Sequence, residues 1–414
     1  MSVDTEGGKA VQRPVQGRAA PLLAAVKRLP WWVQVLAVYI AARLVSACIF
    51  AAATLQQGPG PWGGARPGYW DFINIWDARW YGRIFSEGYP SVLPVDAAGN
   101  VQENAWAFYP LFPLLGRALS AVTGLPAAAS LTTIAMLSGL GAAVVIYLLF
   151  REKADHGDAL WGVVLFSTFP VAAIFQVPYA ESLNTLLLAA ALLLVVRRMY
   201  QEATPVVVLM CLSRPVGVAF AAMIGILLLM CLYRWWKGGK HRGEAGQLVR
   251  LAVLVLISGI SAVLWPLLAW QATGDFQAYT KTESVWRGGG LVPFMPWFHM
   301  GTGLLGPVAG MLAPFALAAV FAWLMFCPPV VRLGTELRLW SAAYMAYLLV
   351  FLHPQTSTFR LLIPLFPLAL GAVFVSRSRA YRGLLVIMFV LLQIVWIVWL
   401  WVWAQLPGGG DYPP

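Results

Sequence analysis

The chain has 414 residues, of which 60% are hydrophobic and only 11% are charged, and its mean hydropathy is +0.74. A soluble domain carries roughly 25% charged residues, so a soluble domain with one anchor is excluded. The net charge of +11 comes from basic residues in short loops and the N-terminal tail, a positive-inside pattern that argues against nucleic acid as a partner. Several runs reach the ~20 apolar residues that cross a bilayer. The composition therefore predicts an all-α polytopic membrane protein.

Residues 1–30 are polar and are expected to form a disordered cytoplasmic tail. The first crossing covers about residues 31–55, and Lys27 and Arg28 precede it, which places the N-terminus in the cytoplasm. Residues 56–130 then form a large first extracytoplasmic loop that carries interfacial helices.

This loop contains the most charged stretch of an otherwise apolar chain, residues 70–90, where Asp71, Asp77 and Glu87 lie among Trp and Tyr residues. Carboxylates beside flat rings at a membrane surface suit a site that handles sugars, because a carboxylate can take a hydroxyl proton. An amphipathic helix anchored at the interface by its aromatic residues is the alternative. Residues 105–115 hold two prolines and are expected to be interfacial or re-entrant.

About eleven crossings are expected in a single transmembrane domain over residues 31–405, followed by a short tail, 406–414. The run 205–232 is expected to break at residues 213–215, because one unbroken crossing would put the following basic loop outside, and proline interrupts a helix. The later crossings cover about residues 131–150, 160–176, 183–196, 205–232 as a broken pair, 251–270, 304–326, 339–352, 361–375 and 384–403. The outside segments are then 56–130, 177–182, 271–302 and 353–359.

Charged residues recur at the predicted outer face. Glu181 begins a crossing, Arg214 interrupts an apolar run, and His353 and Arg360 bracket the last outer loop. An ionisable group at membrane depth costs a few kcal/mol, so it usually faces a partner or a cavity. Each of these residues alone could be a structural ion pair, a snorkelling side chain or a helix cap. Together with Asp77 they converge on one face, which indicates one site.

Five short motifs occur in order over about residues 70–370. They are WDARWY at 76–81 with EGY at 87–89, FYPLFP at 108–113, PYAES at 178–182, SRPVG at 213–217 and RLLIPLFP at 360–367. In this set the chain resembles the PIG-V-like mannosyltransferases, integral-membrane glycosyltransferases of the GT-C class, and their bacterial relatives. Trp76 departs from the phenylalanine that is frequent in relatives. The loop 271–302 matches nothing in the family pattern, which leaves the acceptor open.

The resemblance implies a GT-C-like helical bundle and an inverting transfer of mannose. The donor would be a polyprenyl-phosphate sugar, and the acceptor a hydroxyl of a lipid-linked or glycan molecule on the extracytoplasmic face. Asp77 is implied as the catalytic base, which takes the hydroxyl proton. Asp71 is the competing base, since it lies one or two turns away if this stretch is helical. Glu181 is implied to orient the acceptor or the sugar hydroxyls.

The same resemblance implies that Arg360 and His353 bind the donor phosphate, with Arg214 as a weaker candidate. Their charge-assisted hydrogen bonds would stabilise the negative charge of the leaving phosphate without a cofactor. A divalent metal shared by Asp71, Asp77 and Glu181 is the alternative. Further residues expected to bind substrate along the sugar or prenyl groove are Trp76, Arg79, Trp80, Tyr81, Tyr109 and Tyr179.

Three other functions stay open. A transporter or lipid flippase would explain the broken helix at 213–215, although no internal repeat is apparent. A non-catalytic membrane subunit should tolerate the loss of Asp77. A GT-C enzyme could use glucose, arabinose or aminoarabinose, since a few hydrogen bonds decide sugar choice. Low Lys with high Ala, Arg and Gly usage suggests a bacterial source, and hence a multi-pass protein of the plasma membrane.

Overall fold

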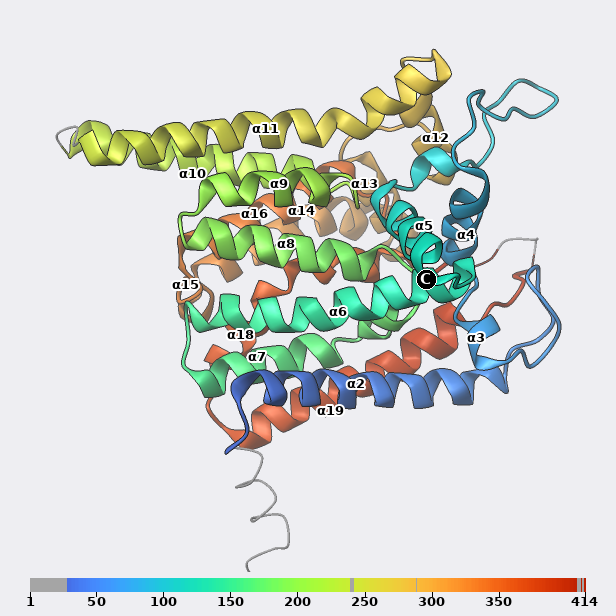
Figure 1. The fold of residues 1–414 in the computed structure, drawn as a ribbon, viewed down its shortest axis with the longest axis horizontal. Coiled ribbons are helices and arrows are strands. Elements are labelled where there is room, and N and C mark those ends of the chain that lie inside the picture. Colours follow the sequence, from blue (N-terminus) through green and yellow to red (C-terminus); the bar gives the residue numbers. More distant parts are fainter. Residues whose placement is uncertain (1–27, 239–241, 288, 408–410, 412) are drawn as a thin grey trace, which may run out of the picture.

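The protein is an all-helical bundle, as the sequence predicts (Figure 1). In the described part of the chain, pairing between extended segments is limited to two isolated β-bridges. Of the predicted tail, residues 1–30, the first 27 lie outside the described residues. The computed structural model describes residues 28–238, 242–287, 289–407, 411 and 413–414.

Long helices lie side by side and alternate in direction along the chain (Figure 1). Among the described residues, most predicted crossings coincide with one helix and the run 205–232 gives two, whereas the predicted crossings 160–176 and 361–375 are broken and also contain the 3-10 helices η2 (Ala172–Gln176) and η3 (Ile363–Leu365). The α-helices at the predicted crossings are α2 (Trp31–Thr54), α6 (Ala127–Arg151), α7 (His156–Thr168), α8 (Glu181–Val196), α9 (Tyr200–Cys211), α10 (Gly217–Lys237), α11 (Arg242–Thr273), α14 (Pro307–Phe326), α16 (Gly334–Phe351), α18 (Pro367–Val375) and α19 (Arg379–Trp396).

Fewer of these helices are full membrane spans than the predicted eleven crossings. Among the described residues, six are long and apolar enough to cross a membrane, and a pair bent by 74°, Thr358–Leu365 and Pro367–Val375, would make a seventh. The others are shorter or less apolar. The helices α8 and α9 are short because α8 starts at buried Glu181 and α9 ends just before Arg214, where the chain supplies polar groups to a common site. The protein is therefore a multi-pass membrane protein.

Basic loops gather at one end of the bundle (Figure 1). Ion pairs tie helix ends together there: Arg197 Nε lies 2.7 Å from Glu152, and Arg382 Nη2 lies 2.7 Å from buried Asp158. The alternation of the helices that the basic residues predicted is confirmed, because the acidic first loop lies at the opposite end.

The opposite end carries short helices that pack over the bundle (Figure 1). Pro110 directly precedes α5 and Pro113 lies in its first turn, where a proline is tolerated. The interfacial or re-entrant placement of residues 105–115 stays a prediction. The short elements of the chain, with α15 at the basic end, are α3 (Tyr69–Phe72), α4 (Asp77–Glu87), η1 (Ala105–Ala107), α5 (Leu111–Thr123), η2 (Ala172–Gln176), α12 (Ala278–Trp286), α13 (Met295–Leu305), α15 (Pro328–Val331), α17 (Thr358–Leu361), η3 (Ile363–Leu365) and η4 (Ile397–Trp401).

The predicted break in the run 205–232 is confirmed. Helix α9 ends at Cys211 and α10 begins at Gly217, so the break contains Arg214. Asn184 on α8 stabilises the break, because its Nδ2 donates to Ser213 Oγ at 2.9 Å. The backbone turn brings Arg214 to the end of the bundle instead of leaving it inside a continuous helix.

Between α7 and α8 the chain is largely buried and leaves the α-helical conformation, with the 3-10 helix η2 in its middle. Arg43 on α2, which is 7% exposed, donates to the carbonyl of Ser167 at 2.6 Å and to that of Ala172. A buried carbonyl without a helix partner needs another donor, and the guanidinium supplies two of them. Arg43 thus holds the segment that leads into Tyr179 and Glu181.

Residues 69–87 do not form one helix. The helices α3 and α4 are separated at Trp76, whose φ of 59° lies in the left-handed region that L side chains rarely adopt. Tertiary contacts hold this conformation: Trp76 Nε1 donates to the carbonyl of Trp401 at 2.9 Å, and Trp401 Nε1 donates to the carbonyl of Phe72 at 2.9 Å. The last helix of the chain therefore sets the start of α4, at Asp77.

Candidate active site

Asp77 is the first residue of α4, directly after the strained Trp76. Its backbone N–H donates to the hydroxyl of Tyr179 at 3.0 Å. Its carboxylate accepts from Arg360 Nη1, and the Asp77 side chain is 13% exposed. The backbone turn thus aims one carboxylate into the interior with an arginine against it.

Glu181 begins α8 and is more deeply buried, with a side chain that is 4% exposed. Its Oε1 lies 2.9 Å from Arg214 Nη1 and 3.3 Å from Arg360 Nη1. Its Oε2 has no hydrogen-bond partner among the described residues. A buried carboxylate oxygen in this state costs free energy, so it is a ready acceptor for a donor that enters the site.

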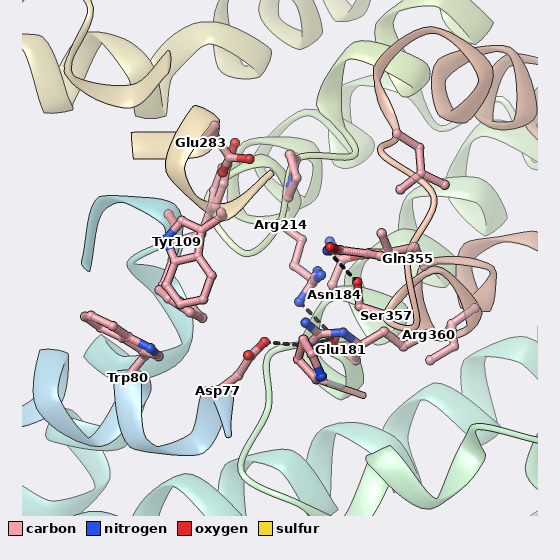
Figure 2. Close-up of a pocket in the computed structure, with 18 of the residues that line it drawn as sticks. Asp77, Trp80, Tyr109, Glu181, Asn184, Arg214, Glu283, Gln355, Ser357 and Arg360 are labelled. Carbon is pink, nitrogen blue, oxygen red and sulfur yellow. Dashed lines mark hydrogen bonds and ion pairs between the residues drawn. The ribbon is translucent and has the colours of Figure 1, made fainter. Parts of the chain in front are cut away.

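Arg360 connects the two carboxylates. It lies on α17 and uses Nη1 for both Asp77 and Glu181, while its guanidinium carbon lies 5.4 Å from the centre of the Tyr179 ring. Its Nε has no partner in the described part of the chain. The two acids, Asp77 and Glu181, and the two arginines, Arg214 and Arg360, form a charge cluster of zero formal net charge whose members come from four separate segments (Figure 2).

The cluster lines a cavity of about 450 Å³ at the short-helix end of the bundle. Trp80 forms part of its wall, with its ring stacked on Phe108 at 5.6 Å and edge-on to Trp286 at 5.5 Å. Flat rings of this kind can cover the apolar face of a sugar. The cavity therefore combines acids, cations and aromatic surface in one place.

A second acid–base pair, which sequence reasoning missed, lies on α12 at the far wall of this cavity (Figure 2). Glu283 Oε2 lies 3.2 Å from Arg287 Nη2, and the Glu283 side chain is 16% exposed. Burial raises the pKa of Glu283, while Arg287 opposes this shift. The spacing of four residues gave a signal, but it also fits an exposed helical ion pair.

The other predicted substrate-binding residues divide by burial. Trp76, Tyr81 and Tyr109 border the cavity but are at least 90% buried, and Tyr179 is fully buried. Each of these four fixes its neighbours: the Tyr109 hydroxyl, for example, lies 3.2 Å from that of Tyr279. Trp80 stays open to the cavity and is the aromatic residue best placed to contact a ligand.

His353 lines the cavity after α16. Burial, with the nearby charges of Arg287 and His299, lowers the pKa of His353 below its ordinary value of 6.5. The imidazole is therefore mostly neutral at pH 7, so it would offer a hydrogen bond and not the positive charge that the sequence suggested.

Asp71 lies apart from the charge cluster. It is exposed on α3 and lines a smaller hollow of about 220 Å³, which it shares with Arg79 and Trp62. Arg79 is also exposed, borders both hollows and donates to the carbonyl of Trp62 at 3.2 Å. Asp71 is separated from the charge cluster because the break at Trp76 turns α4 away from α3.

This separation bears on the metal alternative. Asp71, Asp77 and Glu181 do not line a common cavity. Across the described residues, no three His, Cys, Asp or Glu side chains are grouped to hold a metal ion. The two acids that do meet, Asp77 and Glu181, already bind arginine.

Neither a protein-family model nor a curated protein sequence matches the chain. Among solved structures, the oligosaccharyltransferase of Archaeoglobus fulgidus in its apo form is similar, with 14% identity, a TM-score of 0.47, and coverage of 88% of this chain and 56% of that one. The same enzyme in complex with Zn and sulfate has 15% identity and a TM-score of 0.46, with coverage of 87% of this chain and 53% of that one. The archaeal oligosaccharyltransferase AglB from A. fulgidus, in complex with an inhibitory peptide and a dolichol-phosphate, has 13% identity and a TM-score of 0.43, with coverage of 88% of this chain and 55% of that one. The chain spans little more than half the length of these structures.

Proposed function

We propose that the protein is an inverting membrane glycosyltransferase that moves a sugar from a polyprenyl-phosphate donor to a hydroxyl of a lipid or glycan acceptor. The sequence motifs favour mannose as the sugar. The observation that carries the proposal is the cluster of Asp77, Glu181, Arg214 and Arg360 in one aromatic-walled cavity at the end of an apolar bundle. Acids beside arginines supply both halves of a displacement at a sugar carbon: a base for the incoming hydroxyl and cations for the outgoing phosphate.

Asp77 is the base in this mechanism. The acceptor hydroxyl gives its proton to the Asp77 carboxylate while its oxygen bonds to the anomeric carbon. The bond from that carbon to the phosphate oxygen breaks on the opposite face, and its electron pair leaves with the lipid phosphate. The products are a glycoside of inverted configuration and a polyprenyl phosphate.

Arg360 links the two ends of this reaction. Without substrate it is bound to Asp77, whereas a donor phosphate competes for the same guanidinium. When Arg360 turns to the phosphate, an Asp77 oxygen is released to accept the hydroxyl proton. Activation of the base therefore depends on donor binding. Arg214 remains paired with Glu181 and adds a second cation near the phosphate.

The test is sugar transfer from polyprenyl-phosphate mannose by purified protein in lipid vesicles, with and without EDTA. Asp77→Asn should lower kcat about 10²- to 10⁴-fold, which is the contribution of a general base. Asp71→Asn is the matched control, since Asp71 lies in the smaller hollow, and it should transfer like the wild type. Wild-type transfer should survive EDTA.

Three results would contradict the proposal in different ways. Full activity of Asp77→Asn together with loss in Asp71→Asn would move the base to α3. Loss of activity in EDTA would require a metal. Uptake of a lipid across the vesicle without any transfer would favour the transporter alternative.

A further inference from the structure

The wall of the cavity formed by α12 has no role in the proposed chemistry, yet it is built like a binding surface. It carries Glu283, Trp286 and Arg287, and all three line the same cavity as Asp77 (Figure 2). The 271–302 segment that supplies it lies outside the motifs that suggested the function.

Contacts to the rest of the protein fix α12 in place. Thr282 Oγ1 lies 3.0 Å from Asn104 Nδ2, both residues are buried, and Arg287 Nη1 donates to the carbonyl of Phe351. Trp286 packs edge-on against both Trp80 and Phe108 at 5.5 Å. A side chain on this helix is held as firmly as one on the bundle itself, which is what selective recognition needs.

Glu283 is oriented but keeps free acceptor capacity. Arg287 binds Oε2 at 3.2 Å, and Tyr279 interacts with the same carboxylate. A carboxylate has about four lone-pair sites, so two contacts leave room for two hydroxyl donors. With a side chain only 16% exposed, its bonds to a ligand are largely shielded from water.

Figure 2 shows Arg214 between Glu283 on one side and Glu181 on the other. We place the sugar between the donor phosphate and α12, where Trp286 lies three residues after Glu283 and its ring contacts that of Trp80 at 5.5 Å. An acid next to flat rings matches the two kinds of surface on a hexose, its hydroxyl edge and its apolar face.

We infer that Glu283, with Trp80 and Trp286, forms the recognition site for the transferred sugar and that Glu283 accepts hydrogen bonds from its hydroxyls. This inference rests on the proposed function. A site built to bond a hydroxyl rejects an analogue that lacks it, because its buried polar group is then left without a partner. Glu283 is thus a specificity-determining residue and has no part in the proton transfer.

The experiment uses short-prenyl-phosphate mannose and its four analogues that lack the 2-, 3-, 4- or 6-hydroxyl. Wild-type kcat/KM should fall about 100-fold for at least one analogue, and Glu283→Gln should reduce that ratio to below about 10-fold. Glu103→Gln is the matched control, because Glu103 is an exposed acid at the same cavity, and it should discriminate like the wild type. Equal discrimination by Glu283→Gln and the wild type, or an equal loss for every donor, would overturn the inference.

Binding is measured separately from transfer, by quenching of tryptophan fluorescence in Asp77→Asn protein and in the Asp77→Asn/Glu283→Gln double variant. If Asp77→Asn protein binds some analogues more weakly than others, if this difference disappears in the double variant, and if the wild type transfers no sugar, then the sugar site stands and the proposed chemistry fails. If none binds, both fail. If transfer occurs without any dependence on Glu283, only the recognition site is wrong.

Discussion

Replacing Arg360 by lysine separates charge from geometry at the proposed phosphate site. Arginine has five N–H donors, and in this structure Nη1 serves both Asp77 and Glu181 while Nε–H is buried without a partner among the described residues. When Arg360 turns from Asp77 to the donor phosphate, its planar guanidinium can present two parallel N–H groups, whereas a lysine ammonium is a point charge without that fork. The substitution therefore keeps the charge but removes the second bond of a bidentate pair.

The size of the effect follows from that lost bond. A hydrogen bond to a charged group contributes about 1.5–3 kcal/mol, and each 1.36 kcal/mol is tenfold in rate. We therefore expect Arg360→Lys to lower kcat/KM about 13- to 160-fold. The loss should fall mainly on kcat, because the phosphate gains charge as the glycosidic bond breaks. Arg360→Met should be slower again, since it removes the positive charge that the leaving phosphate needs as well as the bidentate bond.

Steady-state transfer from a short-prenyl-phosphate mannose in lipid vesicles measures this effect. Arg66→Lys is the control, because Arg66 is exposed in the first loop and lines neither hollow. The reasoning would be refuted if Arg360→Lys kept kcat/KM within about threefold of the wild type, or if lysine and methionine gave equal activity.

Two further substitutions test the structure around the site. The pKa of His353 is lowered in the folded protein, so the unfolded chain binds the proton more readily and stability falls as the pH drops below 6.5. Between pH 7.5 and pH 5 the melting temperature should therefore fall less in His353→Gln than in the wild type. Equal pH dependence of the two melting temperatures would contradict this. A Cβ on Gly310 would lie 2.3 Å from the carbonyl group of Gly301, whereas one on Gly303 would meet nothing within 4 Å. Gly310→Ala should therefore lower stability by about 1–3 kcal/mol and Gly303→Ala should not, as thermal unfolding in detergent can check; equal behaviour of the two would place the α13–α14 contact in doubt.

The sequence predicted the parts of the fold that follow from hydropathy and charge. Apolar runs located the crossings, and the positive-inside pattern required the break that holds Arg214. The meeting of Asp77, Glu181 and Arg360 was also predictable, because charged residues in an apolar chain need one another.

Other features depend on contacts that no local pattern reveals. The left-handed conformation of Trp76, which separates Asp71 from Asp77, is held by Trp401, more than three hundred residues later. Glu283 has an ordinary helical ion pair as its only local signal, and its burial arises from the packing of α12 over the cavity. Arg43 is buried against the carbonyls of Ser167, in the last turn of α7, and of Ala172, in η2, both more than a hundred residues later.

That arginine has a consequence for how the protein is made. Helix α2 is the first described span to leave the ribosome, and an arginine near the centre of a helix costs about 2.5–3.5 kcal/mol on insertion. The carbonyls that bind Arg43, on Ser167 and Ala172, are 124 and 129 residues further along the chain. At about 5–20 residues per second they are synthesised roughly 6 to 25 s later. During that interval α2 must hold its charge toward the lipid headgroups or the insertion machinery, so this span reaches its final packing only after α7 and η2 have followed.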